Sequence, residues 1–158
     1  MRPANINAWL VLIPLVPSPA VLWDMRKRQQ NLSLMRRISK EIDPKTLMQY
    51  SKDAKLGTGE LASGDVLETI PKYVSENSGF RISLLNLDLD TYHGTKVALE
   101  HFFPLVTPGE MMFLDEYGMR GWGESDAVDE YFSGIGEKIK INACRDSTKP
   151  TAFIQKPL

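Results

Sequence analysis

The sequence has few of the residues that most often carry metal or redox chemistry. Its 158 residues include one cysteine, Cys144, and two histidines, His93 and His101. A single cysteine excludes an internal disulfide and a cysteine-rich zinc site, and two histidines exclude a histidine-rich one. Any catalysis must therefore depend on carboxylates, hydroxyls or lysines.

The chain also lacks an excess of charge of either sign. Nineteen Lys and Arg residues stand against 20 Asp and Glu residues, so the formal net charge is −1. This balance gives no electrostatic signature for a nucleic-acid partner or an anionic membrane surface. With 42% hydrophobic and 25% charged residues, the composition is that of a globular domain, and we expect a cytoplasmic protein.

One long apolar run stands near the N-terminus, over residues 6–23, and the basic cluster Arg26-Lys27-Arg28 follows it. The run is long enough to cross a bilayer, but three prolines within it oppose an undisturbed helix. It has three interpretations. It is a membrane anchor or targeting segment, which we favour least, a segment packed on the domain or on a partner, or a start foreign to the ancestral domain.

The sequence predicts a division of the chain at residues 63 and 64. We interpret residues 1–63 as an atypical N-terminal segment. In it, Asp43 and Pro44 predict the start of a helix, Gly57 predicts its end, and residues 57–64 predict a loop.

Residues 64–158 show a sharper alternation of helical and strand patterns. Thr69 predicts the N-cap of the first helix, and Pro108-Gly109 predicts a turn before the second strand. The expected helices are 70–76, 92–103 and 125–132, and the expected strands are 82–87, 111–114, 138–143 and 151–154. This order predicts an α/β fold with parallel central strands and a terminal antiparallel hairpin. The apolar central strands predict burial on both faces.

Acidic residues follow both central strands. Asp88 and Asp90 come after the first strand, and Asp115 and Glu116 come after the second. The carboxyl ends of parallel strands meet at one edge of the sheet, so we expect Asp88 to face Asp115. Four carboxylates at one edge repel each other, and they predict a bound cation such as Mg²⁺, Mn²⁺ or Ca²⁺. Alternatively, these residues cap the helices that follow.

Other residues have less specific patterns. Asp65 is a candidate for binding a ligand amine or a simple turn residue. His93 could touch a substrate, but a surface position in the first turn of a helix is favoured. Trp122, between two glycines, is either a lid residue or a packing residue. Cys144 is expected to be a small buried hydrophobe, and the lysines of the terminal hairpin are expected to form a solvated face.

Several motifs resemble those of one known family. They are GDVLETIP (64–71), LDLDTY (87–92), PG (108–109), DEYG (115–118) and AVDEYF (127–132). In order and spacing this set is similar to the macrocin O-methyltransferase-like (TylF/MycF) family. The resemblance covers about residue 64 to the C-terminus.

The resemblance implies a Rossmann-like class I methyltransferase fold that uses S-adenosylmethionine. It implies Mg²⁺-assisted methylation of a hydroxyl on a sugar or natural-product small molecule. Matched position by position, the metal ligands are Asp88, Asp115 and Glu116, the general base is Asp90, and Asp65 lies beside the cofactor's adenine.

This sequence departs from the family pattern at two important places. Where the family usually has Asp-Asp, the chain has Asp115-Glu116, whose second side chain is longer by one methylene. No Gly-x-Gly-x-Gly motif precedes Gly64, although the family carries a glycine-rich cofactor turn upstream. We therefore expect only the C-terminal half of the fold. Its open sheet edge predicts homo-oligomers or self-association. The alternative function is a non-catalytic fragment that binds a metal or a partner.

Overall fold

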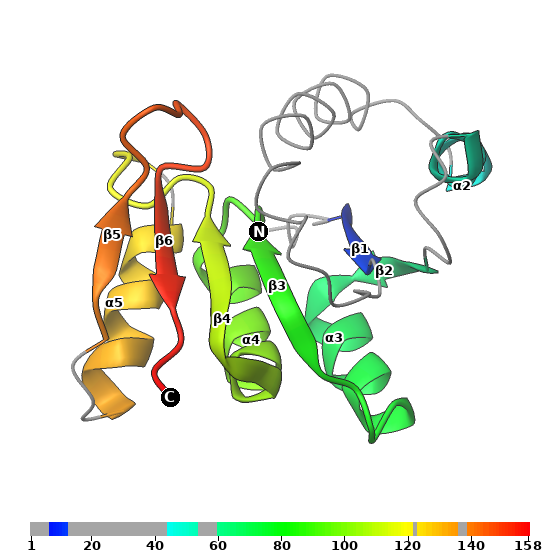
Figure 1. Ribbon diagram of the computed structural model, residues 1–158. Coiled ribbons are helices and arrows are strands. Elements are labelled where there is room, and N and C mark those ends of the chain that lie inside the picture. The colour runs from blue at the N-terminus through cyan, green and yellow to red at the C-terminus, as the bar shows by residue number, and fades with distance from the viewer. Residues whose placement is uncertain (1–6, 13–43, 54–59, 122, 136–138) are drawn as a thin grey trace, which may run out of the picture. The chain divides into compact units, whose positions relative to one another are not determined.

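The computed structural model describes residues 7–12, 44–53, 60–121, 123–135 and 139–158. The described residues from Ser63 onward belong to one compact unit, and those between Trp9 and Ala62 belong to another. The domain boundary expected at residues 63 and 64 stays a prediction. Figure 1 shows the order of the elements along the chain.

The described N-terminal residues form two strands and one helix. Strand β1 (Asn7–Leu12) pairs with β2 (Glu60–Asp65), and α2 (Pro44–Asp53) begins at the expected proline. The loop expected over residues 57–64 is wrong from residue 60 onward, because backbone pairing forms β2 from a sequence with little strand propensity. The helix end expected at Gly57 lies outside the described residues, as does most of the apolar run 6–23. Among the helices described, none has the length and apolar character needed to cross a membrane.

The C-terminal unit contains a four-stranded sheet in the order β3-β4-β6-β5. Its strands are β3 (Ile82–Leu87), β4 (Val106–Leu114), β5 (Ile141–Ala143) and β6 (Ala152–Gln155). Strands β3 and β4 are parallel, and β6 runs antiparallel to both β4 and β5. The parallel centre and terminal hairpin expected from the sequence are therefore confirmed. The self-association expected through a sheet edge stays a prediction.

One face of this sheet carries the core. Figure 1 shows α4 (Tyr92–Phe102) and α5 (Glu124–Ile135) behind the strands, and α3 (Val66–Glu76) beside the edge strand β3. Register places Leu85 beside Met112 and Leu87 beside Leu114, and all four side chains are buried. The expectation that β3 is buried on both faces is wrong, because its alternate residues Leu84 and Asn86 are exposed.

Helix α3 begins earlier than the sequence indicates. Asp65, and not Thr69, is its N-cap, because the Asp65 carboxylate accepts a hydrogen bond from the Leu67 N–H at 2.9 Å. The Thr69 hydroxyl instead donates to the Asp65 carbonyl at 3.0 Å. Satisfying a free N–H in the first turn extends the helix back to Val66.

Strand β4 is longer than expected, and β5 is shorter. The turn expected at Pro108-Gly109 is wrong, because both residues lie inside β4. A register shift in the β3–β4 pairing accommodates them, and Gly109 has the positive φ of 84° that a glycine tolerates. The N–H of Gly109 also donates to the Lys156 carbonyl at 2.9 Å, which fixes the C-terminal end of the chain beside β4.

Candidate functional site

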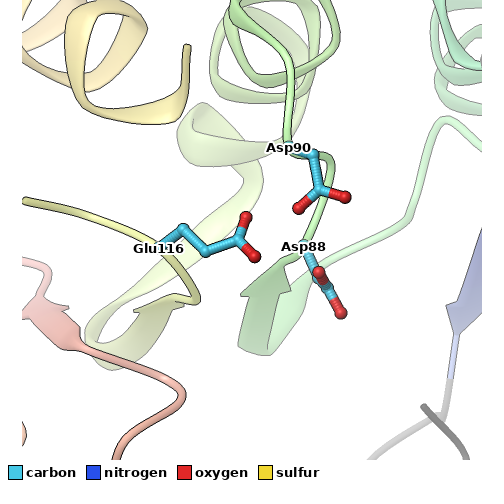
Figure 2. Close-up of side chains that lie close together, drawn as sticks. All are labelled: Asp88, Asp90 and Glu116. Carbon is cyan, nitrogen blue, oxygen red and sulfur yellow. The ribbon is translucent and has the colours of Figure 1, made fainter. Parts of the chain in front are cut away.

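Three of the four carboxylates expected at the sheet edge lie together. Asp88, Asp90 and Glu116 each offer an oxygen, and these oxygens all lie within 4.8 Å of one another. Figure 2 shows the Glu116 side chain, which follows β4, extending toward the segment that carries Asp88 and Asp90. Asp88 is exposed and Glu116 is buried. The site therefore contains a carboxylate group that is open to solvent on one side.

Backbone contacts bring the ends of the two strands together. The Asp115 N–H donates to the Leu87 carbonyl at 3.1 Å. The parallel pairing of β3 and β4 therefore continues up to the acidic residues that follow each strand. The Gly123 N–H donates to the Asp90 carbonyl at 3.3 Å. A Cβ added at Gly123 would collide with the backbone of Tyr92. Glycine at this position therefore allows the start of α5 to approach the segment that carries Asp90.

Asp90 has an unusual backbone and an unusual side chain. Its φ is +57°, in the left-handed region that Asp and Asn adopt more readily than most residues. Its Oδ1 is buried and has no hydrogen-bond partner among the described residues. Buried carboxylate oxygens are nearly always paired with a donor or a cation. An unpaired oxygen on a residue with a left-handed backbone is consistent with a functional position.

Glu116 is held by a residue that the sequence analysis did not single out. Its backbone N–H donates to Glu124 Oε1 at 3.0 Å, and Glu124 is fully buried. Glu124 begins α5, where the partial positive charge of a helix N-terminus stabilises a carboxylate. An acid directly after the glycines that flank Trp122 could have indicated this role.

Lys149 is the second residue that sequence reasoning missed. Its ammonium lies 3.3 Å from Asp115 Oδ2 and also contacts Glu116 Oε1. The solvated face expected for the hairpin lysines is therefore wrong for Lys149, whose side chain is 30% exposed. Long-range contacts of the hairpin loop place Lys149 here. The Thr151 N–H donates to the Leu114 carbonyl at 3.0 Å, and this bond fixes the hairpin loop over the end of β4.

The remaining predicted site residues have defined positions. Asp115 is buried and pairs with Lys149, and it is not one of the three carboxylates that converge. Its role as a metal ligand stays a prediction, as does the cofactor role of Asp65, which the structure places at the N-cap of α3. The alternative that Asp90 caps α4 is not supported, because the N-cap is Thr91, whose hydroxyl accepts from the Gly94 N–H.

Three other residues were considered from the sequence. His93 is exposed, and its ring packs edge-on against Tyr92 with a centroid distance of 5.2 Å. Cys144 is half-buried, and burial raises the pKa of its thiol. Trp122 lies outside the described residues, so its expected role as a lid or packing residue stays a prediction.

Tyr117 offers a test of the connection between the acidic motif and α5. Its hydroxyl donates to Asp129 Oδ1 at 2.8 Å. Burial first, and this hydrogen bond second, raise the pKa of Tyr117 from 10.0 to about 12. Since the folded state favours the neutral phenol, its contribution to stability is full below pH 10 and is lost as the pH rises through about 12.

Ultraviolet absorbance can be titrated against pH for the wild type and for Tyr117→Phe. We expect the difference between the two curves to show the ionisation of Tyr117 near pH 12. Asp129→Asn should move it toward the ordinary value, because the anionic partner is lost. An ionisation of Tyr117 near pH 10 in the folded wild type would contradict the observed contact.

Comparison with solved structures finds this arrangement of strands and helices in O-methyltransferases. The O-methyltransferase NovP aligns with a TM-score of 0.50 and 23% identity, over 60% of this chain and 36% of its own. The apo structure of CalS11, a TDP-rhamnose 3'-O-methyltransferase of calicheamicin biosynthesis, aligns with a TM-score of 0.50 and 32% identity. That alignment covers 60% of this chain and 40% of CalS11. The chain has part of a methyltransferase fold.

The extent of the similarity is limited. The chain spans less than half the length of the two solved structures that it matches. No protein-family model matches the sequence, and no curated protein matches it. The Rossmann-like methyltransferase fold expected from the motifs is confirmed as a partial fold, whereas membership of the TylF/MycF family belongs to the proposal below.

Proposed function

We propose that this chain takes part in S-adenosylmethionine-dependent, Mg²⁺-assisted O-methylation of a sugar or natural-product hydroxyl, as a member of the TylF/MycF-like group. The observation that carries the proposal is the convergence of Asp88, Asp90 and Glu116. Their position at the carboxyl ends of β3 and β4 is where open α/β sheets bind ligands. The similarity to a sugar O-methyltransferase supports the same reaction class.

The donor set fits a hard divalent cation. All three converging groups are carboxylates, and Mg²⁺ prefers oxygen ligands, typically one or two carboxylates together with water or substrate oxygens. The buried Asp90 Oδ1, without a described hydrogen-bond donor, is consistent with a cation nearby. Asp88 and Glu116 would hold the metal, and the adjacent Asp115 would join them as the resemblance implies.

The remaining roles are assigned to the residues of this chain. Bound Mg²⁺ would lower the pKa of the acceptor hydroxyl, and S-adenosylmethionine would supply the methyl group. The Asp90 carboxylate accepts the hydroxyl proton, which is general-base help worth ~10²–10⁴ in rate. Asp65 would bind the adenine side of the cofactor, as the resemblance implies, while its Oδ1 accepts from the Leu67 N–H.

Calorimetric titration of the purified chain with S-adenosylmethionine, with and without Mg²⁺, tests the proposal. We expect saturable binding. We also expect radiolabelled methyl transfer to TDP-rhamnose, the sugar nucleotide of the CalS11 reaction.

The absence of cofactor binding in both conditions would contradict catalysis by this chain alone. The alternative, a non-catalytic methyltransferase-like fragment that binds a metal or a partner, would then be favoured. Its observable property would be metal binding without cofactor binding.

A further inference from the structure

Lys149 occupies the side of Glu116 that faces the terminal hairpin. Its ammonium contacts Glu116 Oε1 and lies 3.3 Å from Asp115 Oδ2. The two carboxylate side chains are 2% and 5% exposed, whereas that of Lys149 is 30% exposed. The lysine therefore reaches from the surface into a buried acidic pair. In this pair a positive charge compensates two carboxylates that would otherwise repel each other.

The hairpin loop is fixed in this position by its neighbours. Besides the Thr151 N–H bond to the Leu114 carbonyl, the Thr151 hydroxyl donates to the Tyr117 carbonyl at 2.8 Å. The Ser147 hydroxyl donates to the Lys149 carbonyl at 2.7 Å, which supports the loop from within. The Lys149 ammonium therefore lies at Glu116 because the loop is hydrogen-bonded to the end of β4 and to Tyr117.

Glu116 belongs to two groups of charges at the same time. One of its oxygens lies within 4.8 Å of oxygens from Asp88 and Asp90, and its Oε1 contacts Lys149. A divalent cation bound among the three carboxylates would lie a few ångströms from the Lys149 ammonium. Both groups are positively charged, so they would repel each other. Their repulsion is large in a partly buried site, so the two cations cannot bind Glu116 independently.

We propose that Lys149 is an internal counter-ion of this site and competes with a divalent cation for Glu116. This inference rests on the proposed metal site. Without a divalent cation, the ammonium neutralises Glu116 and Asp115. When a divalent cation is held by Asp88 and Glu116, Lys149 gives up Glu116 and turns toward solvent. The hairpin loop thereby sets the affinity of the chain for its metal.

Binding of Mn²⁺, measured by electron paramagnetic resonance on purified wild type and Lys149→Met, tests this competition. We expect Lys149→Met to bind Mn²⁺ about tenfold more tightly at low ionic strength, and less so at high salt, because one positive charge has been removed. Lys72→Met is the matched control. It removes the same charge from an exposed position on α3, and its Mn²⁺ affinity should not change.

Two further variants locate the effect. Lys149→Arg keeps the charge and should bind Mn²⁺ close to the wild-type affinity. Adding Glu116→Gln to Lys149→Met should remove the gain, because the contested carboxylate is lost. Folded Lys149→Met with unchanged or weaker Mn²⁺ binding would overturn the proposal, and so would the absence of binding in both wild type and Lys149→Met. Cofactor binding is measured separately, so these results leave the proposed methyl transfer to its own test.

A measurement on the wild-type chain covers the case in which Lys149→Met fails to fold. Peptide mapping after amine acetylation reports how accessible each lysine is. Adding Mg²⁺ should increase labelling of Lys149 several-fold, because the ammonium is released from Glu116, while labelling of Lys72 stays constant. Labelling of Lys149 that does not change at saturating Mg²⁺ would overturn the proposal.

Discussion

Asp90→Asn is expected to lower the rate of methyl transfer by ~10²–10⁴ while preserving the fold. The loss follows from removing the carboxylate that accepts the hydroxyl proton. Asparagine is the suitable replacement because it also tolerates the left-handed backbone, here at a φ of +57°. It keeps an oxygen at the buried position, so Mn²⁺ binding should weaken far less than the rate. The measurement is the initial rate of labelled methyl transfer at saturating cofactor.

The control for this variant is Asp126→Asn, which makes the same chemical change on the exposed first turn of α5. Its rate should equal that of the wild type. A second comparison is Asp90→Ala, which lacks the oxygen and is strained at a positive φ by about 1–2 kcal/mol. It should therefore lose stability as well as activity. If Asp90→Asn kept the wild-type rate, Asp90 would not be the general base.

Phe102→Ala is expected to lower the free energy of unfolding by about 3–5 kcal/mol. Phe102 is 1% exposed and lies on the face of α4 that carries the buried residues Ala98 and Leu99. Its ring also packs against Phe80, with a centroid distance of 6.5 Å. Truncation would leave a cavity between the helices and the sheet, because neighbours in a close-packed core relax only in part. Urea unfolding followed by circular dichroism measures the effect.

Leu67→Ala provides the comparison on a helix surface. Leu67 is 39% exposed, so its truncation should change the unfolding free energy by at most about 0.5 kcal/mol. Similar losses for the two variants would show that the sheet face covered by α4 is not the stabilising core. The acidic site is formed by residues at the ends of two strands of this sheet. A large loss of unfolding free energy in Phe102→Ala should therefore also weaken Mn²⁺ binding.

The periodicity of the sequence predicted much of the C-terminal fold. The apolar strand 82–87 has the bounds of β3, and the helix expected over 92–103 differs from α4 by one residue. These elements were predictable because their side-chain patterns match their own hydrogen-bond geometry. Strand β2 was not predictable, because its residues Glu60–Asp65 form a strand through backbone pairing with β1.

The candidate site was also predictable only in part. The motif DLD (88–90) and the pair Asp115-Glu116 were sufficient to predict carboxylates at one sheet edge, because parallel strands end on the same side. The sequence could not show that Glu116, and not Asp115, converges with Asp88 and Asp90. That choice depends on which way each side chain leaves the end of β4, where Glu124 holds the Glu116 backbone.

The sequence alone determined the types of chemistry that are open to this protein. With one cysteine and two histidines, it excluded a cysteine-rich or histidine-rich metal site, and its strand order placed the acids at one edge. The tertiary structure decided how those acids are neutralised. Lys149 lies 33 residues from Glu116 in the chain, and it reaches that carboxylate because hydrogen bonds from Thr151 fix the hairpin loop against β4. Local patterns do not encode such long-range contacts, which form when the sheet is assembled.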